Sequence, residues 1–159
     1  MEVIYKSIGK IYTPFNHIEE MPIQPTSDTS GSGMIEIDAE YTDALKDLAG
    51  FSHIYLLYHF HEVGQSKLLV TPFLDSAPHG VFATRAPSRP NPIGLSLVKL
   101  VGIEGNRIYV DGVDILNETP LLDIKPYIPE FETLDEVQVG WLEQGKDRIR
   151  SQRSDDRFR

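Results

Sequence analysis

The sequence has no cysteine, no long uninterrupted apolar run and no signal-peptide pattern at its start. Without cysteine the chain can form no disulfide framework, no thiolate zinc site and no cysteine nucleophile. The lack of a long apolar run or a signal pattern argues against a membrane helix or a secretion leader. We therefore expect a soluble, cytoplasmic protein that is not bound to a membrane.

Basic charge is also scarce, because 15 Lys and Arg residues stand against 24 Asp and Glu and give a formal net charge of −9. This balance argues against a protein that coats nucleic acid generally. The charge is uneven, since residues 146–159 hold six of the basic residues and only three acidic ones. Such a tail either contacts phosphates or is a solvated terminus, and the sequence leaves both alternatives open.

The length and composition indicate one domain. The chain has 159 residues, of which 40% are hydrophobic, and this is enough for one packed core. We assign residues 1–145 to this domain and residues 146–159 to the basic tail. Residues 15–33 carry two prolines and a Thr/Ser/Gly cluster, so we expect a long loop there.

Periodicity predicts a mainly β fold. Helical spacing occurs at residues 41–48, and Thr133 with Glu136 resembles a capping box that opens a second short helix. No βαβ rhythm is present, so the elements favour an antiparallel sheet or barrel with two short helices. The β-branched, aromatic and alternating runs predict strands at residues 3–12, 34–38, 52–60, 67–73, 80–83, 95–103, 107–115 and 121–124.

Residues 53–61 alternate, with Ile54 and Leu56 on one face of a strand and three histidines on the other. His59 and His61 lie two residues apart on that second face, a spacing that suits a metal ion in a small metal-dependent barrel enzyme. The alternative is that they are core or interface histidines, and we expect no metal because no further ligand pair is evident. The completing ligands for a metal would be His53, Glu62 or Asp75.

The most informative run covers residues 80–98, whose middle holds two arginines, three prolines, an asparagine and a serine. Proline fixes φ, removes a backbone donor and pushes the preceding residue toward extended geometry. A stiff loop between strands can hold Arg85, Arg89 and Asn91 in fixed directions, which is what a preorganised polar site needs. The alternative is a rigid structural crossover whose arginines pair with local carboxylates.

Residues 80–98 and a second block at residues 119–129 together resemble the signature of the TsaA-like family. Phe51-Ser52-His53 and Phe60-His61 also match, and the resemblance runs from about residue 8 to residue 129. Characterised members of this family include the TrmO-type tRNA methyltransferases. The resemblance implies a compact single-domain antiparallel β-barrel that binds S-adenosylmethionine without a Rossmann fold.

The resemblance also implies a cofactor site, with two departures from the family pattern. Ile23 stands where the family often has Arg, and Asn117-Glu118 replaces the family's Asp-Gly. Asn117 removes a carboxylate, for which Asp114 is a candidate substitute, and Glu118 replaces a Gly that permits unusual φ or a close approach. The implied cofactor-binding residues are Pro22, Ile23, Gln24, His61, Glu62, Arg85, Leu95, Asn117, Glu118, Thr119 and Pro120.

The substrate that the resemblance implies is the adenosine beside the tRNA anticodon, which is methylated on N6 and bears a threonylcarbamoyl group. That group ends in a carboxylate, so Arg89 is the implied substrate-binding residue. A homodimer is implied because the family builds its cofactor site near a subunit contact. The implied catalytic residues are Arg85, Asn91, Asp123, Lys125 and Tyr127.

Two alternatives remain open for these residues. The alternative for Asp123 and Lys125 is a local ion pair with Tyr127 packed beside it. The departure at Asn117-Glu118 also leaves open a non-catalytic module that binds the cofactor or a nucleotide as a sensed ligand.

Overall fold

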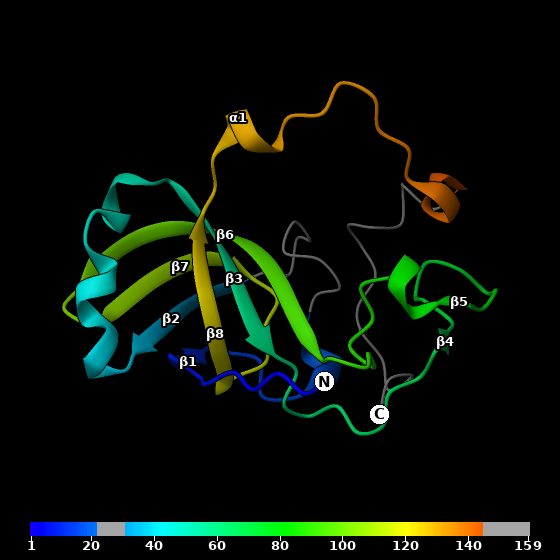
Figure 1. The fold of residues 1–159 in the computed structure, drawn as a ribbon, viewed down its shortest axis with the longest axis horizontal. Coiled ribbons are helices and arrows are strands. Elements are labelled where there is room, and N and C mark those ends of the chain that lie inside the picture. Colours follow the sequence, from blue (N-terminus) through cyan, green and yellow to red (C-terminus); the bar gives the residue numbers. More distant parts are fainter. Residues whose placement is uncertain (22–30, 145–159) are drawn as a thin grey trace.

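A closed antiparallel barrel of six strands forms the body of the protein (Figure 1). The structure is a computed structural model that describes residues 1–21 and 31–144. Around the barrel the strand order is β1-β2-β7-β6-β3-β8, so the mainly β fold with a barrel is confirmed. The strands are β1 (Gly9–Tyr12), β2 (Gly31–Ile37), β3 (His53–His59), β6 (Ile93–Glu104), β7 (Arg107–Val113) and β8 (Thr119–Pro126).

Alternation along the strands fills the barrel with apolar side chains. In β3 the inward residues are buried and the outward ones half-buried, as the period of two predicts. β1 closes the barrel by pairing with β2 on one side and β8 on the other. Burial of aliphatic side chains is the main source of stability for such a core. The side chains that are fully buried include Ile11, Ile35, Ile54, Leu56, Ile108 and Leu121.

One aromatic ring inside the barrel lies against a glycine. Tyr58 of β3 is 5% exposed and sits directly opposite Gly94 of β6. A Cβ atom at Gly94 would overlap the Tyr58 ring, so only glycine fits this position. Phe60 packs edge-on against the same ring at a centroid distance of 5.5 Å. Gly94 therefore belongs to the sequence signature for a packing reason.

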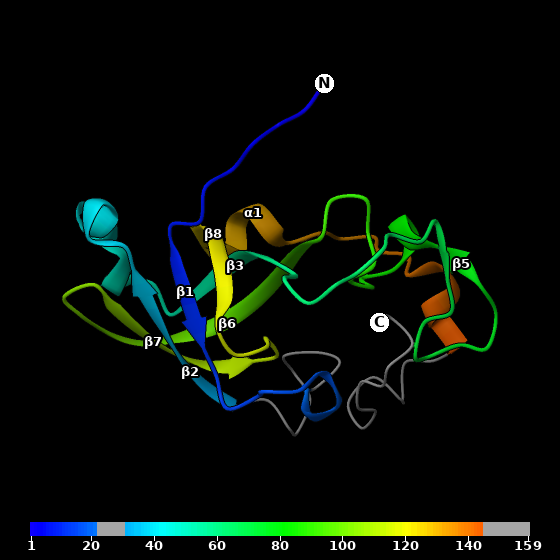
Figure 2. The ribbon, with the colours of Figure 1, turned by 90° about the horizontal axis from the view of Figure 1, so that it is seen from below.

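A smaller unit lies to one side of the barrel, formed by β4 (Leu69–Val70), β5 (His79–Gly80) and the 3₁₀ turn η4 (Val81–Ala83) (Figures 1 and 2). Its own apolar cluster is Val70, Val81 and Ala86 with Phe73. The strand predicted at residues 80–83 is wrong beyond Gly80, because the N–H and the hydroxyl of Thr84 both donate to the Val81 carbonyl and close a turn. The strand predicted at residues 67–73 is reduced to the two residues of β4.

Residues 39–50 form two 3₁₀ segments, η2 (Ala39–Leu45) and η3 (Leu48–Gly50), instead of one helix over residues 41–48. Lys46 leaves the helical region with ψ of 130° and Asp47 is left-handed with φ of 67°, which breaks the helical path between η2 and η3. Tyr41, Leu45 and Leu48 still pack on the barrel core, so the predicted apolar face exists without a continuous helix.

The chain ends differ from the sequence prediction as well. Thr133 closes the helix α1 (Pro129–Glu132) instead of opening one, because its N–H and hydroxyl bond the Pro129 carbonyl. A further 3₁₀ turn, η5 (Gly140–Gln144), follows, and η1 (Ile18–Glu20) lies in the predicted loop at residues 15–33. The first strand begins at Gly9, not at residue 3. The predicted basic tail lies outside the described residues.

Replacing Gly94 with alanine tests the inner contact. The added methyl group overlaps the Tyr58 ring, which cannot swing aside in a filled barrel, so we expect unfolding free energy to fall by about 1–3 kcal/mol. The matched control is Gly102→Ala on the same strand, where a Cβ meets nothing within 4 Å. Urea unfolding of the two variants measures the difference, and equal stability would contradict the packing argument.

Candidate functional site

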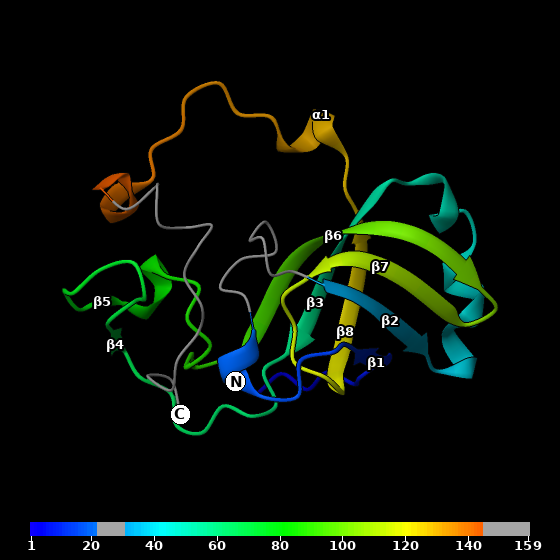
Figure 3. The same cartoon turned by 180° about the vertical axis from the view of Figure 1, so that it is seen from behind.

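Three adjacent strands, β6, β3 and β8, bring Leu95, Asp123 and Lys125 of the predicted site onto one outer face of the barrel (Figure 3). β3 lies between β6 and β8 in the sheet. Leu57 of β3 is flanked by Leu95 of β6 and Asp123 of β8, and in the next row Tyr55 is flanked by Leu97 and Lys125. The first signature block and the second block thus meet across β3, which neither block contains.

Aromatic rings gather at one end of this face. Tyr127 contacts Tyr55 edge-on at 6.0 Å between ring centroids and contacts His53 at 6.3 Å. Desolvation raises the pKa of the Tyr55 phenol, and the hydrogen-bonded carboxylate of Glu132 raises it further, whereas the charge of Arg85 opposes this shift. Arg85 therefore lies close enough to interact electrostatically with the Tyr55 phenol, and its own side chain is exposed.

Asp123 and Lys125 form a local ion pair, as one sequence alternative proposed. Lys125 Nζ lies 2.9 Å from Asp123 Oδ2, and the other carboxylate oxygen accepts from the Ile124 backbone N–H. The hydrogen bond and charge of Asp123 raise the pKa of Lys125. Both side chains are about half exposed, so the pair contributes little to stability and stays open to a ligand.

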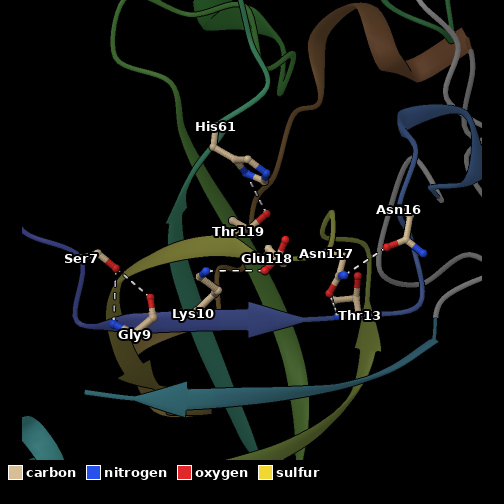
Figure 4. A network of polar contacts seen from close by, with 9 residues as sticks. All are labelled: Ser7, Gly9, Lys10, Thr13, Asn16, His61, Asn117, Glu118 and Thr119. Atoms are coloured by element: carbon tan, nitrogen blue, oxygen red, sulfur yellow. Dashed lines mark hydrogen bonds and ion pairs between the residues drawn. The ribbon is translucent and has the colours of Figure 1, made fainter. Parts of the chain in front are cut away.

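A second group of predicted residues lies at the start of β8, where His61 reaches Thr119 (Figure 4). The Thr119 hydroxyl donates to the Leu116 carbonyl at 2.7 Å, so its oxygen accepts from His61 Nδ1–H at 3.3 Å. This places the proton on Nδ1 and leaves Nε2 as an acceptor in the neutral ring. His61 and Glu62 are both exposed, and Pro120 is half-buried.

The side chain of Asn117 is used to hold the chain together. Its Oδ1 accepts from the Thr13 N–H at 3.0 Å and its Nδ2 donates to Asn16 Oδ1 at 3.1 Å (Figure 4). Its backbone N–H donates to the Phe15 carbonyl at 2.7 Å. The amide thus ties the loop between β7 and β8 to the segment after β1 by accepting one hydrogen bond and donating another, whereas a carboxylate could only accept.

Glu118 adopts the left-handed conformation, with φ of 62°. This is the position at which the family pattern has glycine, the one residue for which that conformation carries no steric penalty. Glu118 Oε1 lies 3.6 Å from Lys10 Nζ, and both side chains are well exposed, so this ion pair offsets little of the strain.

A chain of hydrogen bonds inside the barrel joins Tyr58, Ser96 and Asp114, and the sequence did not predict it. Tyr58 Oη lies 3.0 Å from Ser96 Oγ, and Ser96 donates to Asp114 Oδ1 at 2.6 Å. Since the single Ser96 proton goes to Asp114, Tyr58 donates to Ser96. Burial raises the pKa of Asp114 to about 6, against the Ser96 hydrogen bond and the charge of Arg85. The usable sequence signal was Ser96, a polar residue on the inward side of a strand.

The polar loop of the signature lies between η4 and β6. Arg89 Nη1 donates to the carbonyls of Thr84 at 2.9 Å and Ala86 at 3.0 Å, so this arginine is bonded to its own loop. Asn91 is exposed and its carbonyl accepts from the Ile93 N–H. The predicted cofactor residues Pro22, Ile23 and Gln24 lie outside the described residues.

Among the described residues, His59 and His61 do not gain a third ligand for a metal ion. Within residues 1–21 and 31–144, no group of three His, Asp or Glu side chains is placed to hold a metal ion. His59 is half-buried on the outer face of β3, and His61 bonds Thr119. Across the same residues, no helix combines the length and the apolar character that crossing a membrane requires.

The sequence profile of the tRNA-methyltransferase O N-terminal domain matches residues 10–133. The chain belongs to this family. A crystal structure of TrmO superposes on it with a TM-score of 0.74 at 37% identity, covering 88% of this chain and 64% of the other. A second, from Pseudomonas aeruginosa, gives 0.73 at 34% identity. The chain spans less than two thirds of these TrmO structures, and their likeness confirms the barrel.

Relatives in the TrmO family carry two kinds of description. A probable S-adenosyl-L-methionine-binding protein of Pyrococcus abyssi is 47% identical, covering 98% of this chain and 85% of its own length. An S-adenosyl-L-methionine-binding protein of Archaeoglobus fulgidus is 37% identical, covering 86% and 97%. The human tRNA (adenine(37)-N6)-methyltransferase is 45% identical, covering 59% of this chain and 22% of its own length.

Replacing Glu118 with glycine removes the strain at the left-handed position. We expect the unfolding free energy to rise by about 0.5–1 kcal/mol, after allowing for the greater freedom of glycine in the unfolded chain. Glu118→Ala is the control, because it loses the ion pair with Lys10 and keeps the strain, so it should not be stabilised. Thermal unfolding measures both; a less stable glycine variant would contradict the strain argument.

Replacing Asp114 with asparagine tests the buried carboxyl through pH. Its folded pKa of about 6 lies above the unfolded value of about 3.9, so its contribution to stability is present below about pH 4 and is lost as pH rises through about 6. The asparagine variant lacks this loss. We expect its stability relative to the natural protein to rise by about 2–3 kcal/mol from pH 4 to pH 7. Urea unfolding at the two pH values measures this difference. A difference that does not change between pH 4 and pH 7 would contradict a raised pKa for Asp114.

Proposed function

We propose that this chain is an S-adenosylmethionine-dependent methyltransferase that modifies N6 of the threonylcarbamoyl-adenosine beside the anticodon in tRNA. The observation that carries the proposal is the meeting of the two family blocks at Tyr55. Lys125 of β8 lies directly opposite Tyr55 of β3 in the sheet, and Tyr127 packs edge-on against the Tyr55 ring. The charge of Arg85, from the other block, opposes the rise in the pKa of the Tyr55 phenol that burial causes.

Residues of this outer face, of the loop between η4 and β6 and of the start of β8 fit the chemical groups of S-adenosylmethionine. Arg85 offers an exposed guanidinium for a carboxylate, and Leu95, 48% exposed, offers an apolar surface for a ring. His61 presents Nε2, and the backbone from Asn117 to Pro120 is fixed beside it by the bonds of Asn117 and Thr119. The cofactor supplies a methyl group on a sulfonium, which is electrophilic without further activation.

The chain's own residues then have to orient the acceptor base. N6 of adenine is a weak nucleophile, because its lone pair is delocalised, so an oxygen that accepts its hydrogens assists the attack. Asp123 and Asn91 are the proposed acceptors, Lys125 holds Asp123 by its ion pair, and Tyr127 stacks on the base. Much of the rate enhancement comes from holding the two reactants in line.

The threonylcarbamoyl group gives the substrate an additional carboxylate. A guanidinium recognises such a group through paired, charge-assisted hydrogen bonds. The anticodon loop is single-stranded, so the base reaches an aromatic platform without being flipped from a duplex. A tRNA substrate also favours a cytoplasmic location.

We also propose that the protein acts as a homodimer. Ile93 and Leu95 on the outer side of β6 are 39% and 48% exposed, and Phe131 after β8 is 78% exposed. Large apolar side chains of this kind next to a site favour a partner surface. A second copy of the chain would cover Ile93 and Phe131 beside the site, and light scattering in solution measures the mass directly.

The substrate assignment is tested with two tRNA preparations, one carrying the threonylcarbamoyl group and one without it. Mass spectrometry of the nucleosides should find a new methyl group on the modified adenosine only, and calorimetry should detect S-adenosylmethionine binding. Binding without transfer to either tRNA would favour the sensing module. Absence of binding would refute the proposal as a whole.

Replacing Arg85 with alanine should lower kcat/KM for methyl transfer roughly tenfold to a hundredfold, since the variant loses charge-assisted hydrogen bonds to an anionic group. The matched control is Arg107→Ala, which removes another exposed arginine that pairs with Glu36 on the β2–β7 side of the barrel. Equal activity of the two variants would show that Arg85 has no role in the site.

A further inference from the structure

The backbone that carries Arg85 is held on both sides by one side chain. Arg89 Nη1 donates to the carbonyl of Thr84 at 2.9 Å and to that of Ala86 at 3.0 Å, the residues immediately before and after Arg85. A guanidinium is planar, permanently charged and offers its donors in fixed directions. Two carbonyls bound to one nitrogen therefore have little freedom to move apart, and Arg89 braces the loop from within.

Trp141 holds the carbonyl that comes just before this pair. Its indole Nε1–H donates to the Ala83 carbonyl at 2.8 Å. Trp141 belongs to η5, drawn in orange beside β5 and η4 in Figures 1 and 3. The family profile ends at residue 133, so this contact comes from beyond the part of the chain that the profile matches.

The indole ring is itself held in place by a fixed imidazole. Trp141 stacks on His79 with the ring centroids 4.6 Å apart and the planes 19° from parallel. His79 Nε2 lies 2.7 Å from Asp75 Oδ2, and Asp75 Oδ1 accepts from the N–H groups of Ser76 and Ala77. Stacking fixes the plane of the indole, so its single N–H points at one acceptor.

We propose that Arg89 and Trp141 are positioning residues for Arg85. Together they hold three carbonyls around it, so that its exposed side chain leaves the loop in one direction. This inference rests on the proposed function, in which Arg85 binds an anionic group. It also reassigns Arg89, which the sequence predicted to bind substrate, to support of the loop. The purely structural alternative is that Trp141 only covers the small apolar cluster beneath η4.

Two variants remove the hydrogen bonds and keep the bulk of each side chain. Trp141→Phe keeps an aromatic ring over His79 and loses the donor, and Arg89→Met keeps the length and loses both bonds. We expect amide hydrogen exchange at residues 84–86 to be roughly fivefold faster or more in each, and S-adenosylmethionine affinity to fall roughly fivefold. The controls are Val137→Ala, at a position 65% exposed in the same C-terminal segment, and Arg107→Met.

A double-mutant cycle separates positioning from general stability. If Trp141 acts through Arg85, Trp141→Phe should cause no further loss of affinity in an Arg85→Ala background, whereas independent effects would add. Unchanged exchange, or faster exchange with unchanged affinity, would overturn the inference while leaving the proposed function intact. Failure of the natural protein to bind S-adenosylmethionine would instead overturn the proposed function.

Discussion

The contact between the Tyr58 ring and Gly94 is the constraint on which the arrangement of the barrel and its outer face depends. The two residues lie directly opposite each other on β3 and β6, and no larger residue fits at position 94. A shift of register by one residue would turn every outward side chain of the strand inward. The inner contact therefore fixes the register of β3 against β6, and it places Leu57 beside Leu95 on the outside. The site on the outside is set by packing on the inside.

This division explains why the signature has two different halves. The loop half carries polar residues between prolines, and Arg89 uses its donors on that loop. The strand half alternates, so Gly94 and Ser96 face the interior while Leu95 faces outward. A polar chain is tolerated in an apolar barrel only when its members have partners, and Ser96 meets this condition by bonding both Tyr58 and Asp114.

Regular features were predictable from the sequence, and features set by single hydrogen bonds were not. The period of two in β3 is visible in residues 53–59, and the barrel followed from the family resemblance. By contrast, the helix expected at residues 41–48 is broken by the left-handed Asp47, a conformation that residue spacing does not reveal. The hydrogen bonds from Arg89 to the Thr84 and Ala86 carbonyls could not be predicted either, because they depend on the path of the loop. The sequence does place Ser96 as a polar residue at an inward position of the strand. The family resemblance, however, pointed to its exposed neighbour Leu95 as a site residue.

Arg85 connects the interior with the outer face. Burial raises the pKa of Asp114 and Tyr58 inside the barrel and that of Tyr55 on the outside, and the charge of Arg85 opposes each of these rises. Electrostatic effects act in both directions, so the charge on Asp114 also favours Arg85 in its place. With a pKa of about 6, Asp114 is mostly ionised at neutral pH and loses this charge in mild acid. The packing that keeps Asp114 away from water thus sets the pH at which its attraction for Arg85 is lost.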